Sequence, residues 1–593
     1  MTTTDPDKQT VQITRFCDSR RNWTRITTVR IVVQTVMFGL FLAFVFLTTF
    51  ANLDRYPGLR HWLGKFLEID PLISIATALT THTVYKGLLW SLIILIPTLF
   101  LGRFFCNWIC PYGSLHQFVG WLFRRTRSAG PPSPATPARQ PENVGLGGPT
   151  LQRAETSATV RERILAPAVL APAIEANRYR RSQHVKYYVL VAMLVAAAFG
   201  TLQIGLLDPL CLLYRSFTGA VVPALNMVVP DLFGDYRFHQ GAWLIGFLLF
   251  GLVAMNLVYP RFFCRVLCPL GALLGILSRF AWWRIERDPV KCQGCDRCRL
   301  HCEAACDPHT QLRKAECFVC FNCIEDCPEG ALSFKLFPAR THEVTGPDAS
   351  RRKLIFAGIT GLLFYPFVRT SGRSTRDFAS NVIRPPGAVE ELEFLERCLK
   401  CDQCGRVCPT NVIQPAWFES GLEGLWSPIL NFRMGHCQLH CTACGHVCPS
   451  GAIQRISVAE KLGLGEFAGA GPIKLGTAHI DPGRCLPHSK SIPCVVCEEV
   501  CPTSPKAIYG ERVVRTLRDG QQVELKLPRI DIDRCIGCGI CERECPVVGD
   551  RRAVYVTAEG ETRSQHHPQR DRDRSVRPPN ATSPGDSAGG PNP

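Results

Sequence analysis

Two cysteine-rich stretches decide the fold of the middle of the chain: CQGCDRCRLHC at residues 292–302 and CFVCFNCIEDCP at residues 317–328. Both follow the spacing C-x2-C-x2-C-x3-C of bacterial ferredoxins, in which three cysteines hold one 4Fe-4S cube and the fourth holds the neighbouring cube. A zinc site would use two C-x2-C pairs or include histidine, so zinc is the weaker alternative. The spacing therefore predicts a two-cluster ferredoxin-like domain over 286–340. Its expected ligand sets are Cys292, Cys295 and Cys298 with Cys327, and Cys317, Cys320 and Cys323 with Cys302.

One irregularity follows the first stretch. Glu303 replaces the proline that usually comes after the fourth cysteine, and Cys306 offers a rival fourth ligand. With Cys17 and Cys211, Cys306 is one of three cysteines that no repeated motif absorbs. The plain interpretation of these three is a free thiol.

Four more cysteine groups occupy the last third of the chain, and each ends in C-x3-C-P. Thiolates suit iron because they are soft anions, and the short turns at Gly405, Gly445 and Gly537 let backbone amides point at cluster sulfurs. These groups predict a four-cluster ferredoxin-like domain over 385–556 and, with the first two, six 4Fe-4S clusters in all. The expected ligands are Cys398, Cys401, Cys404 and Cys408; Cys437, Cys441, Cys444 and Cys448; Cys485, Cys494, Cys497 and Cys501; and Cys535, Cys538, Cys541 and Cys545.

The rest of the composition points to a membrane. With 593 residues the chain is long enough for several domains, and 46% hydrophobic against 20% charged residues excludes an intrinsically disordered chain. Four charge-free stretches approach the roughly 20 residues that cross a bilayer as a helix, whereas buried core helices are the alternative. They predict a four-helix transmembrane domain over 1–285, with spans at 31–53, 87–102, 187–207 and 241–259.

Positive charge gives the orientation of these spans. The net charge of +17 arises from 67 Lys and Arg against 50 Asp and Glu. Six basic residues precede the first span and twelve lie in 103–186, against four in 55–86 and two in 208–240. The positive-inside rule then places both ends of the bundle in the cytoplasm, as in a multi-pass protein of the bacterial inner membrane. Because much of this charge lies in loops beside helices, a nucleic-acid partner is disfavoured.

Two segments are expected to be disordered, because neither can bury enough apolar surface to fold. The loop 130–176 is rich in Pro, Ala and Gly, and the tail 559–593 is polar. The first 30 residues lack an apolar core before a cleavage site, so they are not expected to be a cleaved signal peptide.

An internal repeat spans the predicted loop. The motif R-F-F-C-x3-C-P-x-G occurs at residues 103–113 and again at 261–271, and Asp70-Pro71 recurs as Asp208-Pro209. Two cysteines four apart on a helix share a face, so the two repeats would present four thiolates around a pseudo-twofold axis. One further metal or iron–sulfur centre is the resulting hypothesis, and redox-active thiols or packing of helix ends are the alternatives. The candidate ligands are Cys106, Cys110, Cys264 and Cys268.

A fifth apolar segment, 350–370, separates the two ferredoxin regions. Arg351 and Arg352 precede fifteen uncharged residues, and this order resembles a twin-arginine export signal. Insertion would leave 286–340 in the cytoplasm and place 385–556 in the periplasm. The alternative is an ordinary helix, with both regions in the cytoplasm.

The whole pattern resembles two known families. Residues 1 to about 340 look like the NapH/MauN-type membrane ferredoxins, which are related to NosR and FixG/CcoG, because they combine apolar spans, two C-x3-C-P motifs and a two-cluster ferredoxin. Residues 350 to about 556 look like the NapG/MauM-type four-cluster ferredoxins, with their twin-arginine start and the C-x8-C-x2-C-x3-C-P spacing at 485–502. The chain thus resembles a fusion of the two.

The resemblance implies a function. It suggests a membrane-bound electron-transfer component of a quinol dehydrogenase, with the quinone pool as donor and a periplasmic redox protein as acceptor; whether the chain is itself an enzyme stays open. The alternative, also suggested by the relatives, is an electron donor for the maturation or regulation of a metalloenzyme. His82 and His116, near predicted membrane boundaries, are candidates for quinol proton transfer or, more simply, interfacial side chains.

Overall fold

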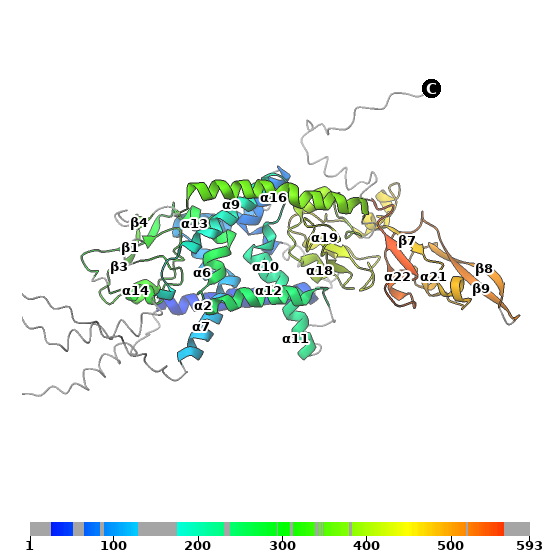
Figure 1. The fold of residues 1–593 in the computed structure, drawn as a ribbon, viewed down its shortest axis with the longest axis horizontal. Coiled ribbons are helices and arrows are strands. Elements are labelled where there is room, and N and C mark those ends of the chain that lie inside the picture. The colour runs from blue at the N-terminus through cyan, green and yellow to red at the C-terminus, as the bar shows by residue number, and fades with distance from the viewer. Residues whose placement is uncertain are drawn as a thin grey trace, which may run out of the picture. The chain divides into compact units, whose positions relative to one another are not determined.

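A computed structural model describes residues 25–50, 65–82, 88–128, 175–229, 238–292, 295–308, 312–337, 343–344, 347, 349–378, 382–517 and 520–562 (Figure 1). Cys17, nearly all of the predicted loop 130–176 and most of the predicted tail 559–593 lie outside these ranges. The chain divides into two compact units. The first comprises residues 1–42, 93–190 and 247–355, and the second comprises 43–92, 191–246 and 356–593.

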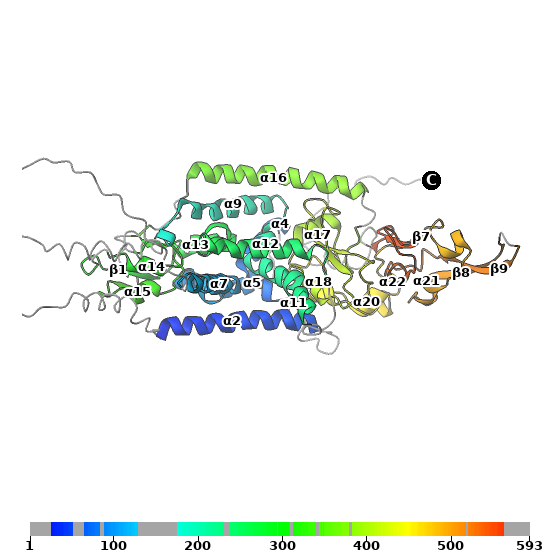
Figure 2. The same ribbon diagram turned by 60° about the horizontal axis from the view of Figure 1, so that its bottom comes forward.

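Several helices contribute residues to both units. They are α2 (Arg25–Phe50), α5 (Leu88–Leu101), α9 (Val185–Ala198), α12 (Ala242–Ala254) and α16 (Arg351–Phe378) (Figure 2). The other helical elements of the first unit are α6 (Phe104–Trp108), α7 (Pro111–Ser128), η1 (Arg181–His184), η4 (Met255–Leu257), η5 (Phe263–Leu267), α13 (Pro269–Ser278), α14 (Arg297–Leu300) and α15 (Asn322–Glu325). Those of the second unit are α4 (Pro71–Thr81), η2 (Ile204–Leu206), α10 (Pro209–Ser216), η3 (Phe217–Val221), α11 (Val222–Val228), α17 (Glu391–Arg397), α18 (Gln403–Val407), α19 (Ala443–Val447), α20 (Val458–Leu462), η6 (Gly465–Phe467), η7 (Leu486–Lys490), α21 (Val496–Glu499) and α22 (Ile540–Glu544).

The four-helix transmembrane domain is not confirmed. Among the described residues, two helical stretches are long and apolar enough to cross a membrane, Ile26–Thr48 and Pro209–Val228. The first matches the predicted span 31–53, whereas the second, which is 56% buried, was not predicted and suits a core helix equally well.

Glycines border the helices at the other three expected spans, and Gly200 ends the helix inside the span 187–207. The helices there have 14, 14 and 13 residues, below the roughly 20 that a bilayer requires. Gly102 follows α5, Gly200 follows α9 and Gly241 precedes α12, each with a φ between +72° and +91° that interrupts a right-handed helix. A charge-free run therefore overestimated the length of continuous helix.

In the first unit, short helices and a two-stranded sheet surround the first cysteine groups. Strands β1 (Trp283–Arg287) and β3 (Leu332–Leu336) pair antiparallel with Ile285 opposite Phe334, and β2 (Leu312–Arg313) pairs parallel with β4 (Glu343–Val344). Helices α14 and α15 each carry the third cysteine of a group. A β-strand and a turn that bears cysteines thus occur in two copies, as expected of a two-cluster ferredoxin-like fold.

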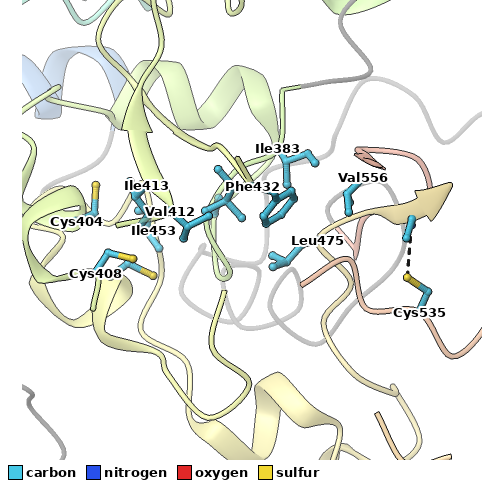
Figure 3. Packing of buried hydrophobic residues seen from close by; sticks show 14 of the residues in the cluster. Ile383, Cys404, Cys408, Val412, Ile413, Phe432, Ile453, Leu475, Cys535 and Val556 are labelled. Atoms are coloured by element: carbon cyan, nitrogen blue, oxygen red, sulfur yellow. Dashed lines mark hydrogen bonds between the residues drawn. The ribbon is translucent and has the colours of Figure 1, made fainter. Parts of the chain in front are cut away.

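The second unit contains three antiparallel pairs of strands. They are β5 (Ile413–Pro415) with β6 (Pro428–Leu430), β7 (Thr477–Ile480) with β10 (Val554–Thr557), and β8 (Ile508–Thr516) with β9 (Gln522–Ile530). One apolar core runs beneath the cysteine loops, where Phe432 and Leu475 lie between Val412 and Val556 (Figure 3). Because the cysteines themselves belong to this core, their loops are fixed by the same packing that stabilises the fold.

Candidate iron–sulfur sites

The first unit brings cysteines of both its groups together. A cavity of about 380 Å³ is lined by Cys292, Cys295, Cys298 and Cys327. The amide of Ala331 donates to the Cys327 sulfur at 3.2 Å. This is the expected first ligand set, in which the fourth cysteine comes from the other group.

The second expected set surrounds Cys323. Burial raises the pKa of this thiol most, and the neighbouring thiolates of Cys320, Cys317 and Cys302 raise it further. Cys298 of the first set acts on the same thiol, so the two sets are neighbours.

Cys306, the rival fourth ligand, is in contact with Cys302. The two sulfurs are 3.6 Å apart, and the amide of Cys306 points at the Cys302 sulfur at 3.5 Å. A hydrogen bond from the Cys306 thiol lowers the pKa of Cys302 to about 7, so Cys302 is the better thiolate. Cys306 also bonds to the Cys317 thiol, so it contacts two expected ligands of the second set.

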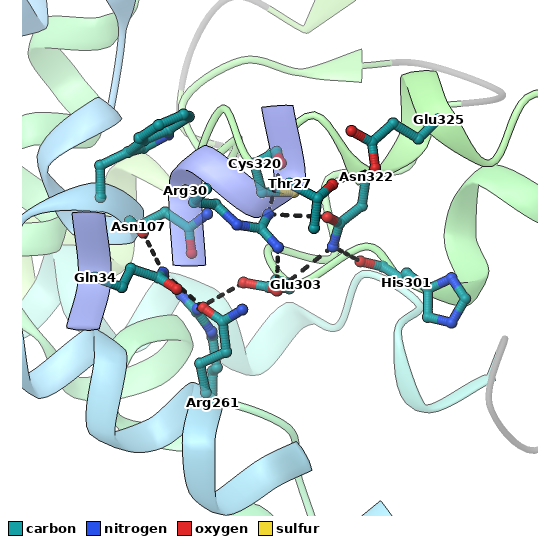
Figure 4. A network of polar contacts seen from close by, with 12 residues as sticks. Thr27, Arg30, Gln34, Asn107, Arg261, His301, Glu303, Cys320, Asn322 and Glu325 are labelled. Carbon is teal, nitrogen blue, oxygen red and sulfur yellow. Dashed lines mark hydrogen bonds and ion pairs between the residues drawn. The ribbon is translucent and has the colours of Figure 1, made fainter. Parts of the chain in front are cut away.

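Glu303, the residue in place of the usual proline, anchors the second set to α2 and to the turn that precedes η5 (Figure 4). Its carboxylate forms ion pairs with Arg30 of α2 at 3.7 Å and with Arg261 at 2.6 Å. Arg30 also donates to the carbonyl of Cys320 at 2.6 Å and to the side chain of Asn322 at 2.9 Å. The sequence flagged Glu303 as an irregularity and gave no sign of these long-range partners.

A second buried network holds the same loop from its other side. Arg103 donates to the carbonyl of Ala315 at 3.0 Å and pairs with Glu316 at 3.6 Å. Glu316 also binds Lys186 and accepts from the Tyr187 hydroxyl at 2.9 Å. Arg103 and Arg261 occupy equivalent places in the internal repeat, so both repeats position the loop that carries the second set.

In the second unit, two cavities receive cysteines from the third and fourth groups. The larger, of about 460 Å³, is lined by Cys398, Cys401, Cys404 and Cys448. The smaller, of about 330 Å³, is lined by Cys408, Cys437, Cys441 and Cys444. Lys461 lies 3.4 Å from the Cys437 sulfur, where its positive charge favours a thiolate.

The last two groups exchange their fourth cysteines in the same way. A cavity of about 320 Å³ is lined by Cys501, Cys535, Cys538 and Cys541. The remaining four cysteines of these two groups are close enough to interact electrostatically. Burial raises the pKa of Cys497 to about 12, and repulsion from the thiolates of Cys485, Cys494 and Cys545 adds to this shift.

The sets of the second unit follow one another without a gap. The amide of Cys437 donates to the carbonyl of Cys538 at 2.9 Å, which joins the fourth-group loop to the sixth-group loop. Cys541 lies within electrostatic reach of Cys497, and α18 connects Cys404 directly to Cys408. Electrons could therefore pass from set to set along this unit.

These sites fit a 4Fe-4S cube better than a single ion. Among the described residues, no three His, Cys, Asp or Glu side chains converge closely enough to bind one metal ion. Four sulfurs around a cube of four irons lie farther apart than around one zinc, to which each would be about 2.3 Å. Burial together with neighbouring thiolates raises the pKa of Cys298 to about 12, so a compensating positive charge is needed for these thiolates to coexist.

The C-x3-C-P motifs differ from expectation in one respect. Cys106 lies in α6, but Cys110 follows the end of that helix; Cys264 lies in η5, and Cys268 caps α13 by accepting from Gly271 at 3.2 Å. The two cysteines of each motif therefore do not share one continuous helical face, because each C-P step starts a new helix. The repeats nevertheless bring the four sulfurs within mutual electrostatic reach, and Cys110, Cys264 and Cys268 are buried.

The two histidines have different surroundings. His82 is exposed at the end of α4, as an interfacial side chain would be. His116 is only 1% exposed: its Nδ1 is 2.9 Å from the side-chain oxygen of Asn256, and its ring stacks on Phe263. Among the described residues its Nε2 and the hydroxyl of adjacent Tyr112 have no hydrogen-bond partner. His116 is therefore a buried side chain, and its position at a membrane interface stays a prediction.

Family models agree with the cysteine sites. A model described as a 4Fe-4S binding domain matches residues 83–129, 240–286 and 444–461, and another so described matches 527–550. A 4Fe-4S dicluster domain matches 397–452. No solved structure matches the chain.

Curated relatives are ferredoxin-type proteins. The chain is 31% identical over 209 residues to the methylamine utilization ferredoxin-type protein MauM of Methylorubrum extorquens, a match of 33% of this chain and 84% of MauM. It is 33% identical over 168 residues to the ferredoxin-type protein NapG of Escherichia coli, covering 28% of this chain and 65% of NapG.

A third relative, YccM of Escherichia coli, has a name that refers to electron transport. It is 24% identical over 293 residues, which are 49% of this chain and 66% of YccM. The chain thus spans just under two thirds of YccM and of NapG, and 41% of an uncharacterized protein of Methanocaldococcus jannaschii. Cysteine spacing, family models and relatives agree: the chain belongs to the family of ferredoxin-type 4Fe-4S proteins that includes MauM, and it is an iron–sulfur electron-transfer protein.

Proposed function

We propose that the chain carries six 4Fe-4S clusters and passes electrons through a membrane-bound relay from the quinol pool to a redox partner in the periplasm. The observation that supports this proposal best is that the cysteines gather in six ligand sets of four. Each set combines three cysteines from one motif with one from the neighbouring motif. Such clusters exchange one electron at a time, as a relay requires.

The first experiment measures iron and labile sulfide in the full-length protein isolated in detergent under anaerobic conditions. Six cubes give about 24 iron atoms per chain, and one further iron–sulfur centre would add up to about four more. About half as much iron would contradict the count of six clusters. Zinc in place of iron would contradict the whole proposal.

Exposed apolar helix faces support a membrane location. On α2, Val32, Val36 and Leu40 are more than half exposed, and on α16 Phe356 and Phe367 are about two thirds exposed. Surfaces of this kind on soluble monomers are small, and larger ones face lipid or a partner. We propose that both helices cross the inner membrane, with α16 inserted by Arg351 and Arg352.

Reporter fusions test this topology. We expect a periplasmic reporter to be active when fused after Asn381 or at the C-terminus, and inactive when fused after Arg287. The double variant R351K with R352K should abolish the signal of the reporter fused at the C-terminus. In a control fusion after Asn381 that is directed to the Sec pathway instead, the same double variant should leave the signal unchanged. Activity of a cytoplasmic reporter at both downstream positions would place all six clusters on one side.

We propose His116 as the proton acceptor for quinol. Burial lowers its pKa to about 4, so the ring is neutral at pH 7 and has an unpartnered nitrogen beside an unpartnered tyrosine hydroxyl. Neutral imidazole and a hydroxyl are suitable partners for the two polar groups of a quinol headgroup.

Anaerobic mixing of the membrane-bound protein with menaquinol or ubiquinol tests this part. We expect the clusters to be reduced, and the rate to fall at least tenfold in His116→Gln with iron content unchanged; the same substitution at exposed His82 is the control. Reduction only by other donors, with no steady-state quinol turnover, would favour the alternative of an electron donor for metalloenzyme maturation.

The four C-x3-C-P cysteines are proposed to hold one further iron–sulfur centre. Their sulfurs act on one another, the buried Arg103 and Arg261 lie three residues before Cys106 and Cys264, and the 4Fe-4S binding domain model covers both motifs. Two guanidinium groups would balance the negative charge of such a centre. Replacing all four cysteines with alanine should lower the iron content; unchanged iron with an intact fold would leave these residues as thiols that pack helix ends.

A further inference from the structure

Two buried aspartates, Asp70 and Asp208, begin equivalent helices of the internal repeat. Each is 0% exposed and caps a helix whose first residue is proline, α4 for Asp70 and α10 for Asp208. One oxygen of Asp70 accepts the amides of Leu72 at 2.7 Å and Ile73 at 3.3 Å. One oxygen of Asp208 accepts two amides in the same way, each at 3.0 Å.

The two side chains also interact with each other. Oδ2 of Asp70 and Oδ1 of Asp208 receive no hydrogen bond from any other described residue, and a side-chain hydrogen bond between the two carboxyl groups contributes to the pKa of both. Two carboxylates have only acceptors, so such a bond requires one proton between them. Burial raises the pKa of Asp70, and the charge of Asp208 raises it further; burial also raises the pKa of Asp208.

The proton is not needed for the capping. Asparagine caps helices as well as aspartate does, and its amide could donate to the opposite carboxylate without any acidic proton. This chain instead has two acids at the two positions. The pair can therefore change its charge while both caps stay in place.

The pair lies next to the loop that carries the third cysteine group. Cys211, fully buried in the first turn of α10, donates to Asp208 and lies within electrostatic reach of Cys401. One turn later, Arg215 donates to the carbonyl of Lys400 at 3.0 Å. A side chain at Gly205 would come within 2.0 Å of the carbonyl of Leu399, so backbone meets backbone there.

Other charged groups near the pair are already engaged. Cys211 and Arg215 interact with the aspartate pair, and Cys401 interacts with both Cys211 and Arg215. Helix α4 packs on η2, which contains no titratable residue, and on α17. The acids of α17 have their own partners, which are Arg384 for Glu391, Arg397 for Glu393 and Arg369 for Glu396. Cys211 and Arg215 each interact with Asp208 and with Cys401, so a change of charge at the cluster site reaches the aspartate pair through these two side chains.

We propose that Asp70 and Asp208 bind one additional proton when the cluster held by Cys398, Cys401, Cys404 and Cys448 is reduced, and release it when that cluster is oxidised. The electron comes from the preceding centre of the relay and the proton from water. The oxidised cluster and the singly protonated pair thus become the reduced cluster and the doubly protonated pair, with one electron and one proton added. The inference rests on the proposed ligand set, and on no particular electron donor.

Redox titrations of the full-length protein, followed by electron paramagnetic resonance at several pH values, test the proposal. The signal of this cluster is identified as the one lost in Cys401→Ser. Its midpoint potential should fall with rising pH by up to 59 mV per unit, the value for one proton per electron. The slope should vanish in the double variant D70N with D208N. The matched control is Glu68→Gln, which removes a half-buried acid of raised pKa two residues before Asp70 and should keep the slope.

Infrared difference spectra provide a second readout. Reduction should change the absorption of a protonated carboxyl group in the wild type, and this change should be absent in the double variant. If the double variant fails to fold, D70N and D208N alone, each of which keeps a hydrogen bond between the two side chains, serve instead. A wild-type potential independent of pH overturns the proton uptake. Absence of any signal that depends on Cys401 overturns the ligand set, and hence the proposed function, instead.

Discussion

At the scale of single residues, the contact between Cys302 and Cys306 bears on the fourth ligand of the second cluster set. Sequence alone left Cys302 and Cys306 as alternatives, because both lie at workable distances from the next motif. In the fold, the sulfurs of Cys302 and Cys306 are 3.6 Å apart, and this contact lowers the pKa of Cys302 to about 7, which favours its thiolate form. A thiolate is the form that binds iron.

We therefore expect Cys302→Ser to lose the iron of one cluster, and Cys306→Ser to keep it. Removing Cys306 should instead shift the potential of that cluster, because hydrogen bonds to ligand sulfurs tune it. Iron analysis and redox titration of the two variants, prepared side by side, check both outcomes. Equal iron loss in the two would show that Cys306 also binds iron.

His116 gives a pH dependence of stability. Its folded pKa is about 4 against an ordinary value of 6.5, so only the unfolded chain takes up a proton as the pH falls from 6.5 towards 4. Stability from this residue is complete above pH 6.5 and lost progressively below it, by roughly 1 kcal/mol at pH 5.5. Calorimetry should show that His116→Gln loses less stability than the wild type between pH 7 and 5.5. An identical loss in both would place the titrating group elsewhere.

At the scale of elements, the loops that bear cysteines could be predicted and the helix lengths could not. Four ligands around a cube impose a short local spacing, and that spacing is written directly in the motifs. Helix α9 ends before Gly200, which has a φ of +91°. Gly200 lies beside Glu396, which comes from a distant segment of the chain. Lack of charge carries no such information, so the predicted span 187–207 extended well past the end of α9. The aspartate pair and the Glu303 network also depend on segments far apart in sequence.

Helix α16 offers a matched pair of glycines. A methyl group at Gly361 would lie 2.3 Å from the carbonyl of Ala192 in α9, whereas nothing lies within 4 Å of one at Gly358. Gly361→Ala should therefore destabilise the packing of α16 on α9 by about 1–3 kcal/mol. Gly358→Ala should leave stability unchanged or raise it by up to about 1 kcal/mol, because alanine favours the helix. Denaturant unfolding of the two variants measures the difference, and equal effects would mean that α9 and α16 are not in contact.

At the scale of the whole molecule, apolar surface and basic charge make separate predictions. The exposed faces of α2 and α16 should hold the protein in the membrane after washing with high salt or alkaline carbonate, because neither treatment weakens contacts with lipid tails. Release by salt alone would show that the net charge of +17 is what attaches it. Fractionation followed by immunoblotting, with a known integral and a known peripheral protein as references, separates the two cases.

The exchange of fourth cysteines also constrains the order of synthesis. The set that opens at Cys485 is completed only by Cys545, and the set of Cys501, Cys535, Cys538 and Cys541 is completed in between, so the two are nested. While the ribosome is still making this region, three thiols of the outer set wait without a fourth. Until residue 545 has emerged, these three thiols are open to oxygen and to stray metals. A ribosome that stalls shortly before Cys545 would release a protein with one cofactor missing and a reactive trio of cysteines in its place.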